Sequence, residues 1–218
     1  MADSHTPEAA QTPETAQDLG AAQDLGAAQT TEAVQTFEPE GRAIPFAEEG
    51  AGPAVVLIAE RGESIAYLGA LAHSLTQEDF RVVRIGGRAD EESASSPAER
   101  AQDVVDLLDQ LGVGDAWIGG HGHGGTIARH VALEHHDRVD GVLLLGVEPL
   151  QPPLAAGLPV LVIQGTADDV TPAQNGRTLQ ESAPELVSVV AVEGAGHDFP
   201  ATHVGETSWA IEDYLDWD

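Results

Sequence analysis

Residues 115–131 read DAWIGGHGHGGTIARHV, and this stretch decides the fold. A short apolar run at 116–118 predicts a buried strand, and residues 126–133 have helical spacing. Five glycines lie between them, within residues 119–125. A strand that turns directly into a helix needs glycine for positive φ and for close backbone approach. The helix that starts there presents unpaired N–H groups, so the turn is suited to binding an anion or an oxyanion.

The glycines match two different motifs, and the turn alone does not choose between them. Gly120, Gly122 and Gly125 have the G-x-G-x-x-G spacing of a dinucleotide-binding turn. Gly120, Gly122 and Gly124 instead align with G-x-S-x-G, the nucleophile elbow of hydrolases. In that second alignment the nucleophile position is Gly122, so the rest of the chain has to decide.

Composition limits the classes of function. The chain has 218 residues, no cysteine and a formal net charge of −28, and its nine basic residues are all arginine. Such an acidic surface disfavours binding to nucleic acid and to anionic membranes. The lack of cysteine excludes disulfides and thiol catalysis. We find neither a signal-peptide pattern nor an apolar stretch of roughly 18 residues, and we therefore expect a cytoplasmic protein that does not span a membrane.

The first 33 residues differ from the rest. They are rich in Ala, Gln, Thr, Glu and Pro, and the hexapeptide AQDLGA occurs in them twice. Few large apolar residues occur there, so this segment cannot form a core. We expect residues 1–33 to be a disordered acidic tail and residues 34–218 to form one domain.

Beyond the tail, apolar runs alternate with helical patterns. The runs are continuous rather than alternating, which is typical of strands buried on both faces of a mostly parallel sheet. The sequence therefore predicts an α/β domain with helices on both faces and a site on the loops at the carboxyl ends of the strands. The predicted elements are a hairpin within 34–46, strands at 53–59, 81–85, 116–118, 141–145, 159–164 and 187–192, and helices at 64–75, 96–111, 126–133, 172–182 and 205–215.

Two of these carboxyl-end loops carry side chains suited to acid–base chemistry. Residues 165–172 read GTADDVTP and contain Asp168, and residues 194–200 read GAGHDFP and contain His197. Alone, such an aspartate is typical of a turn and such a histidine of a solvated loop. Together they place a carboxylate beside an imidazole, where Asp168 can orient His197 and hold its tautomer.

From about Val34 to the C-terminus the chain resembles the α/β-hydrolase superfamily. Residues 119–146 are similar to the family's elbow strand end, elbow helix and following strand. VLVIQGTADDVTP and VEGAGHDFP are similar to the segments that bear its acid and its histidine, in the family's order. Together these segments favour the hydrolase elbow over the dinucleotide turn. Residues 145–159 leave no room for the family's cap domain, so the resemblance implies a capless α/β-hydrolase fold.

The chain also departs from the family pattern. The family's nucleophile falls on Gly122, so a covalent serine ester is excluded there. Its oxyanion donors fall on the backbone N–H groups of Arg61 and His123, and its usual His-Gly falls on Ala59-Glu60. A carboxylate at Glu60 opposes a developing oxyanion unless it is protonated or paired, for example with Arg61. The missing side chain at Gly122 leaves space for a water molecule.

Two functions are consistent with these features. In the first, the protein is an enzyme without a serine nucleophile, and His197, oriented by Asp168, acts as general acid or base. Water-mediated hydrolysis, elimination, isomerisation and cyclisation of a small molecule are then feasible. The alternative is a catalytically inactive hydrolase-like protein that binds a small molecule or a protein partner.

The sequence calls for no cofactor and no metal. His121, His123 and His197 do not have a good metal-ligand spacing, and we expect His121 to pack beneath the elbow. We expect Trp209, Tyr214 and Trp217 to anchor the core. An oligomer is compatible with the sequence, because a capless site would be either open or covered by a partner subunit.

Overall fold

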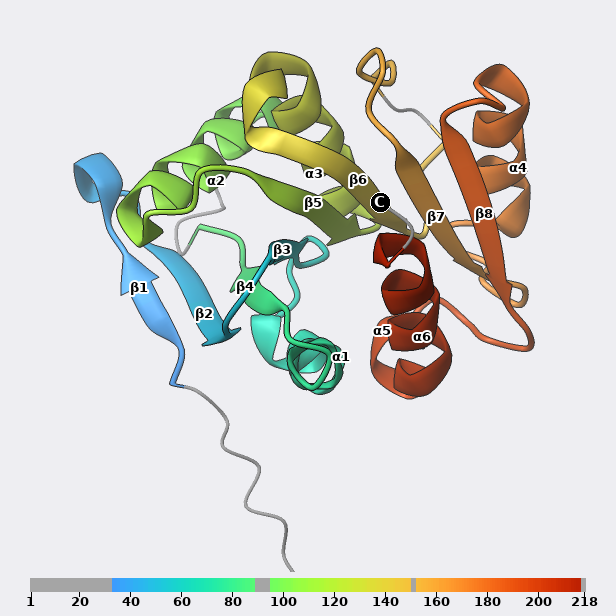
Figure 1. Ribbon diagram of the computed structural model, residues 1–218, viewed down its shortest axis with the longest axis horizontal. Helices are drawn as coiled ribbons and strands as arrows, with labels where there is room; N and C mark the ends of the chain where they lie inside the picture. The colour runs from blue at the N-terminus through green and yellow to red at the C-terminus, as the bar shows by residue number, and fades with distance from the viewer. Residues whose placement is uncertain (1–32, 89–94, 150–151, 217–218) are drawn as a thin grey trace, which may run out of the picture. The chain divides into compact units, whose positions relative to one another are not determined.

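The computed structural model describes residues 33–88, 95–149 and 152–216. The tail predicted for residues 1–33 lies outside this range except for its last residue. The described chain forms an eight-stranded sheet in the order β1-β2-β4-β3-β5-β6-β7-β8 (Figure 1). Strands β3 to β8 run parallel, whereas β1 and β2 are antiparallel at one edge. The mostly parallel α/β domain predicted from the sequence is confirmed.

The strands coincide with the apolar runs, because each central strand is buried on both faces of the sheet. They are β1 Gln35–Phe37, β2 Ile44–Gly50, β3 Ala54–Ile58, β4 Arg81–Ile85, β5 Ala116–His121, β6 Val139–Leu145, β7 Val160–Gly165 and β8 Val187–Val192. The edge strands β1 and β8 differ from the central ones, because residues 35–37 and 188–191 are half-buried or exposed.

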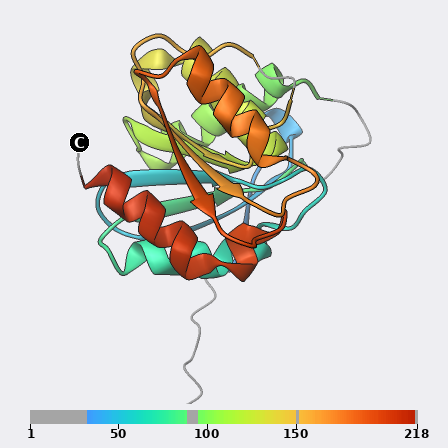
Figure 2. The same cartoon turned by 90° about the vertical axis from the view of Figure 1, so that its right-hand side faces the viewer.

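Helices cover both faces of the sheet (Figures 1 and 2). The core on one face is closed by α2, α3 and α4, and the core on the other by α1, α5 and α6. Successive residues of β5 alternate between the two cores, with Ile118 in the first and Trp117 in the second. The helices are α1 Gly69–Thr76, α2 Pro97–Leu111, α3 His123–Glu134, α4 Ala173–Ser182, α5 Phe199–Thr202 and α6 Val204–Leu215.

Local sequence signals explain where α2 begins and ends. The side chain of Ser96 accepts a hydrogen bond from the backbone N–H of Glu99, and the Glu99 carboxylate accepts one from Ser96 in return. Such a capping box satisfies N–H groups that the first turn leaves unpaired. Gly112 then ends the helix in the left-handed conformation, with φ of 66°.

The structure corrects three details of the sequence analysis. The helix expected over residues 64–75 is a 3-10 turn, Ile65–Leu68, followed by α1, and the short helix α5 was not predicted. Trp209 does not anchor the core, because it is 62% exposed while the next two residues of α6 face the sheet. Tyr214 does pack against the core, edge-on to Trp117, and Trp217 lies outside the described residues.

The connection from β6 to β7 determines how open the site is. Only residues 146–159 join the two strands, which is far shorter than an independent domain. The domain therefore has no cap at this position. Within the part of the chain that the structure describes, no helix is both long and apolar enough to cross a membrane.

Helix α3 lies close against the sheet at its first turn. A methyl group added at Gly124 would lie 2.2 Å from the carbonyl oxygen of Ile58 in β3. Backbone of a central strand cannot move aside for such a contact without disturbing the sheet. Glycine at this position is therefore what allows the helix to begin directly over the strand end.

We predict that Gly124→Ala lowers the free energy of unfolding by about 1–3 kcal/mol, because the added methyl overpacks the contact with β3. Gly114→Ala is the matched control, because a methyl there meets nothing within 4 Å. Urea denaturation of both variants and the parent protein measures the effect. Equal unfolding midpoints for the two variants would contradict the prediction.

Candidate active site

The turn between β5 and α3 has Gly122 at its tip, in the strand–turn–helix arrangement predicted from the sequence. Gly122 has φ of 48° and ψ of −109°, a conformation that side chains rarely adopt. Its N–H donates to the carbonyl oxygen of Leu145 over 2.9 Å, and its carbonyl accepts from the N–H of Gly125 over 3.0 Å. These bonds fix the turn at the carboxyl ends of the neighbouring strands.

Asp168 and His197 come together as the sequence analysis expected. The Nδ1 atom of His197 lies 3.0 Å from Oδ2 of Asp168. Asp168 also accepts hydrogen bonds from the backbone N–H groups of Val170 and Thr171 and from the Thr171 hydroxyl. Burial raises the pKa of Asp168, but these bonds outweigh it and the pKa lies below its ordinary value. An ionised Asp168 accepts from Nδ1–H, which leaves Nε2 of His197 for chemistry.

Glu60 fills the space beside the elbow. Its Oε1 accepts a hydrogen bond from the backbone N–H of Arg61 over 2.7 Å, and its Oε2 accepts one from the N–H of His123 over 3.0 Å. A Cβ atom on Gly122 would lie 1.7 Å from Oε2. Two expectations therefore need correction: Glu60 fills the space left for a water molecule, and the two N–H groups expected to hold an oxyanion already hold a carboxylate.

The side chains of Asp168, His197 and Glu60 form one array across the site. The Nε2 atom of His197 lies 3.6 Å from Oε2 of Glu60, on the side of the ring opposite Asp168. The Glu60 and His197 side chains are 21% and 22% exposed, whereas that of Asp168 is fully buried. A ligand can therefore reach Glu60 and His197 but not Asp168.

Arg61 does not pair with Glu60 through its guanidinium group, as the sequence analysis suggested it could. Its Nη2 atom lies 3.1 Å and 2.9 Å from the two ring nitrogens of His123, and only its backbone N–H holds Glu60. His123 also lies 3.5 Å from Glu148, which accepts a hydrogen bond from the Thr126 hydroxyl. Hydrogen bonding by His123 holds the pKa of Glu148 below its usual value.

Two residues that the sequence analysis did not identify, Glu148 and Tyr67, complete the site. The sequence gives a weak indication of Glu148, because it follows the end of β6 and so belongs to a carboxyl-end loop. The sequence gives no indication of Tyr67, which lies in a 3-10 turn and reaches the site only through folding. Its hydroxyl accepts a hydrogen bond from the Glu60 N–H over 2.9 Å and lies 3.1 Å from Nδ1 of His121.

His121 lies beneath the elbow and is buried. Its Nε2 is 2.9 Å from the carbonyl oxygen of His197, and because a carbonyl only accepts, Nε2 carries the proton. Nδ1 therefore accepts from the Tyr67 hydroxyl. Burial lowers the pKa of His121 to about 4 and raises the pKa of Tyr67, so both side chains stay neutral at pH 7.

Glu60, His121 and His197 could also be considered as metal ligands, because one potential ligand atom of each lies within 4.8 Å of the others. Both ring nitrogens of His121 are engaged, however, by Tyr67 and by the His197 carbonyl. A cation bound to His121 would break one of these buried hydrogen bonds. The donor set therefore does not favour a metal at this position.

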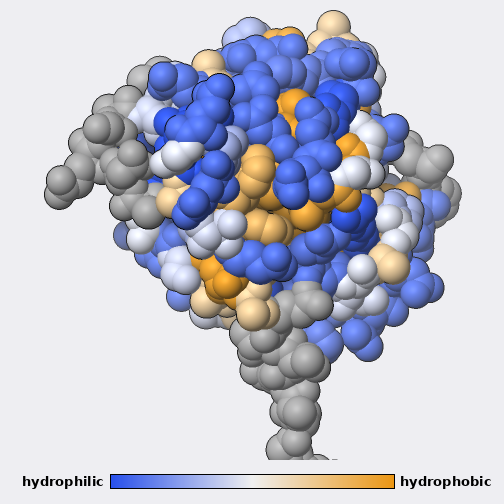
Figure 3. Space-filling view, turned by 90° about the vertical axis from the view of Figure 1, so that its left-hand side faces the viewer, coloured by the Kyte–Doolittle hydropathy of each residue, from blue (hydrophilic) through white to orange (hydrophobic). Residues whose placement is uncertain are grey.

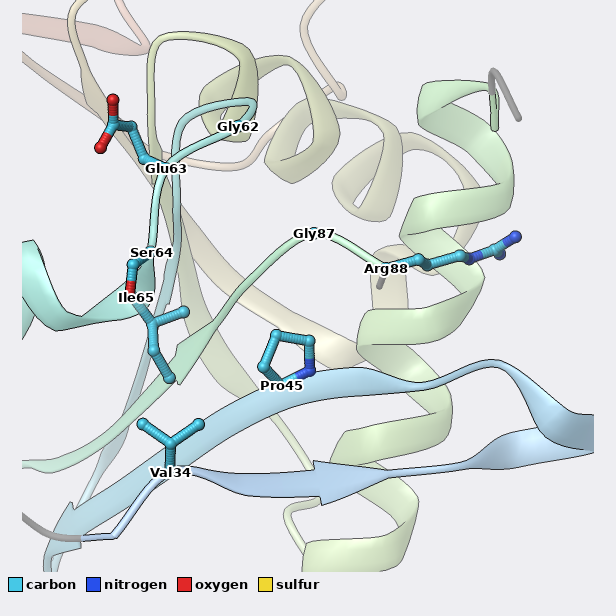
Figure 4. Close-up of a pocket in the computed structure, with 8 residues that line it drawn as sticks. All are labelled: Val34, Pro45, Gly62, Glu63, Ser64, Ile65, Gly87 and Arg88. Carbon is cyan, nitrogen blue, oxygen red and sulfur yellow. The ribbon is translucent and has the colours of Figure 1, made fainter. Parts of the chain in front are cut away.

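A cavity of about 240 Å³ borders the loop that carries Glu60. Its lining combines apolar side chains with polar ones from this loop and from the end of β4: Val34, Pro45, Gly62, Glu63, Ser64, Ile65, Gly87 and Arg88 (Figure 4). Seen from the β1 side of the molecule, apolar surface gathers at the centre of a largely polar face (Figure 3).

Comparison with known proteins places the chain among hydrolases. The sequence model of the Alpha/beta hydrolase family matches residues 63–205. Bifunctional epoxide hydrolase 2 of Rattus norvegicus is 31% identical over 131 residues, which cover 57% of this chain and 24% of that protein. The chain thus spans about a quarter of the length of this curated relative.

Solved structures agree on the fold. A thermophilic esterase from Thermogutta terrifontis has a TM-score of 0.75 at 16% identity, covering 84% of this chain and 98% of that one. A bromoperoxidase from Bacillus anthracis has a TM-score of 0.74 at 17% identity, covering 84% of this chain and 100% of that one. At these identities the likeness concerns the fold alone.

We predict that Gly122→Ser alone does not create an esterase, because the new Cβ would meet Glu60. Combining it with Glu60→Gly removes the obstacle and frees the N–H groups of Arg61 and His123 to hold an oxyanion. The double variant is expected to hydrolyse a nitrophenyl ester, and adding His197→Ala should lower that rate at least about a hundred-fold. Release of nitrophenolate measures all three rates.

Glu63→Gly combined with Gly122→Ser is the matched control, because Glu63 lies on the same loop and is exposed. This control should remain inactive. Equal activity of Gly122→Ser with and without Glu60→Gly would show that Glu60 does not block the elbow.

We predict that His121 makes stability depend on pH between 4 and 6.5, because its pKa falls from 6.5 to about 4 on folding. In this window the unfolded imidazole binds a proton and the folded one does not. The free energy of unfolding therefore falls as the pH is lowered, by up to about 1.4 kcal/mol per pH unit. Urea denaturation across this pH range measures how the free energy of unfolding changes with pH. In His121→Gln this slope should be smaller by up to about 1.4 kcal/mol per pH unit, the contribution of one proton. In His73→Gln, the exposed control, the slope should be unchanged.

Proposed function

The chain belongs to the alpha/beta hydrolase family, and from this premise we propose that it is an enzyme that works without a serine nucleophile. His197, oriented by Asp168, transfers protons on a bound small molecule or on water. The observation that carries the proposal is the 3.0 Å contact between Nδ1 of His197 and Asp168, with Nε2 on the side of Glu60 and the His197 side chain 22% exposed. No cofactor enters this chemistry.

The position of Glu60 favours some reactions over others. Hydrolysis of an ester or amide develops negative charge on a carbonyl oxygen, which needs free donors. Here the donors hold the Glu60 carboxylate. Reactions that form no such oxyanion at the N–H pair are therefore favoured, including addition of water to a strained ring ether.

The curated relative is named an epoxide hydrolase, and we propose an epoxide as the first substrate class to test. In the reaction, the water oxygen bonds to a ring carbon, the ring C–O bond breaks, and the released oxygen takes a proton. Water loses one proton, so the product is a diol and no proton is gained or lost overall. An acid–base group such as His197 suits both transfers.

The charge of the site disfavours an anionic substrate. Glu60, Glu148 and Asp168 all lie on loops of this site, and the net charge of the chain is −28. Such a field raises the local concentration of cations and disfavours anions. We accordingly propose a small, uncharged molecule rather than a carboxylate, a phosphate or a nucleic acid.

A second candidate function is favoured by the same contact, that of Glu60 with the two backbone N–H groups. Glu60 lies where a nucleophile would begin and occupies both backbone donors. That arrangement would also suit a catalytically inactive member of the family that binds a small molecule or a protein partner.

We predict that the protein hydrates styrene oxide and that His197→Ala lowers kcat/KM by about a hundred- to ten-thousand-fold, because the positioned acid–base group is lost. Asp168→Asn should also cause a large loss, since Asp168 holds the reactive tautomer. His73→Ala is the control, because that side chain is 65% exposed. Chromatography of the diol measures the rates.

Isothermal titration of the same variants separates the two candidates. If styrene oxide binds equally to the parent protein and to His197→Ala and is not turned over, the binding function is supported instead. Turnover that does not depend on His197 would contradict the proposed mechanism.

A further inference from the structure

We infer that Glu60 is a second catalytic residue: its carboxylate is the base, and protonated His197 the acid, of a pair that moves protons on one neutral substrate. The inference rests on the proposed function, because it assigns His197 one half of the acid–base chemistry. The inference adds a base, Glu60, whose carboxylate the sequence analysis considered only as a group that opposes an oxyanion.

The Glu60 carboxylate is held as a preorganised anion. Both oxygens accept backbone N–H bonds, at 2.7 Å from Arg61 and 3.0 Å from His123. His123 is the first residue of the 12-residue helix α3, so the positive end of the helix dipole adds to these bonds. The backbone of Glu60 is fixed as well, through its bond to the Tyr67 hydroxyl. Position and charge are therefore set before any ligand arrives.

Glu60 can also be reached by a ligand. Its side chain is 21% exposed and lies in the space that an elbow side chain would otherwise occupy. The 3.6 Å separation from Nε2 of His197 is too long for a hydrogen bond but short enough for one substrate to touch both groups. Asp168, by contrast, is fully buried and can act only through His197.

The pair balances its protons when water adds to a ring ether. A water proton passes to Oε2 of Glu60 while the water oxygen bonds to the ring carbon. The ring C–O bond breaks, and its oxygen takes the proton from Nε2 of His197. After the diol leaves, the Glu60 carboxyl returns its proton to Nε2, which restores the carboxylate and the imidazolium. Because the two groups lie 3.6 Å apart, beyond direct hydrogen-bond distance, a water molecule that takes the place of the diol carries this proton between them.

The first test uses nitrobenzisoxazole, a neutral carbon acid that needs a base and neither a serine nor water. The base removes its ring C–H proton, a nitrile forms, and the N–O bond breaks to give a coloured phenolate. We expect the protein to accelerate this elimination and Glu60→Gln to lower the rate at least about a hundred-fold. Glu185→Gln, at an exposed position just before β8 and so at the opposite ends of the strands from the site, should leave the rate unchanged.

A second variant keeps the test sharp if Glu60→Gln folds poorly. Glu60→Ala should lose the activity, and added formate should restore part of it by occupying the same two N–H groups. A residue that only stabilised the turn would not give this rescue. Retention of the full rate by a folded Glu60→Gln would overturn the proposal, as would a parent rate no faster than that of free acetate.

The test also separates this inference from the proposed function. If nitrobenzisoxazole turnover depends on Glu60 while styrene oxide is inert, the base role stands and the epoxide assignment fails. Single turnover of styrene oxide in heavy-oxygen water distinguishes a base from a nucleophile at Glu60. If the label appears only in the diol, Glu60 acts as a base. If the label appears in the peptide that contains Glu60, a covalent ester has formed and the inference is overturned.

Discussion

The hydrogen bonds between the Glu60 carboxylate and two backbone N–H groups determine what the rest of the site can be. They place Oε2 1.7 Å from where a Cβ on Gly122 would lie, so a side chain at position 122 would have to displace the Glu60 carboxylate from these bonds. The same bonds occupy the donors that acyl transfer would need. Gly122 and Glu60 are therefore compatible with each other, because the carboxylate occupies space that a side chain at position 122 would need.

A partly buried series of hydrogen bonds supports this arrangement. From the Glu60 N–H it runs through the Tyr67 hydroxyl and the ring of His121 to the carbonyl of His197. Each group in it is satisfied, which is the condition under which buried polar groups add order rather than cost. This series of hydrogen bonds links the loop after β3 to the loop after β8, and so helps to set the distance between the Glu60 carboxylate and the His197 imidazole.

Some of this could be predicted from the sequence, and the reason is topological. Apolar runs reveal buried parallel strands, and the loops that follow them must meet at one edge, which brings Asp168 beside His197. The direction of a single side chain has no such signature. Neither the rotation of Glu60 onto the N–H pair, nor the contact of Tyr67 with His121, nor the exposure of Trp209 follows from a local pattern, because each depends on tertiary packing.

Asp168 and His197 support each other. Three hydrogen bonds from residues 170 and 171 hold the buried carboxylate of Asp168, and together with the hydrogen bond from His197 they keep its pKa below the ordinary value. His197 needs Asp168, because that contact fixes its tautomer and directs Nε2 toward Glu60. What the dyad can do is then set by what it faces. A hydroxyl beside two free donors suits acyl transfer, whereas the carboxylate that Glu60 places on those donors suits the proton transfer that we propose for this chain.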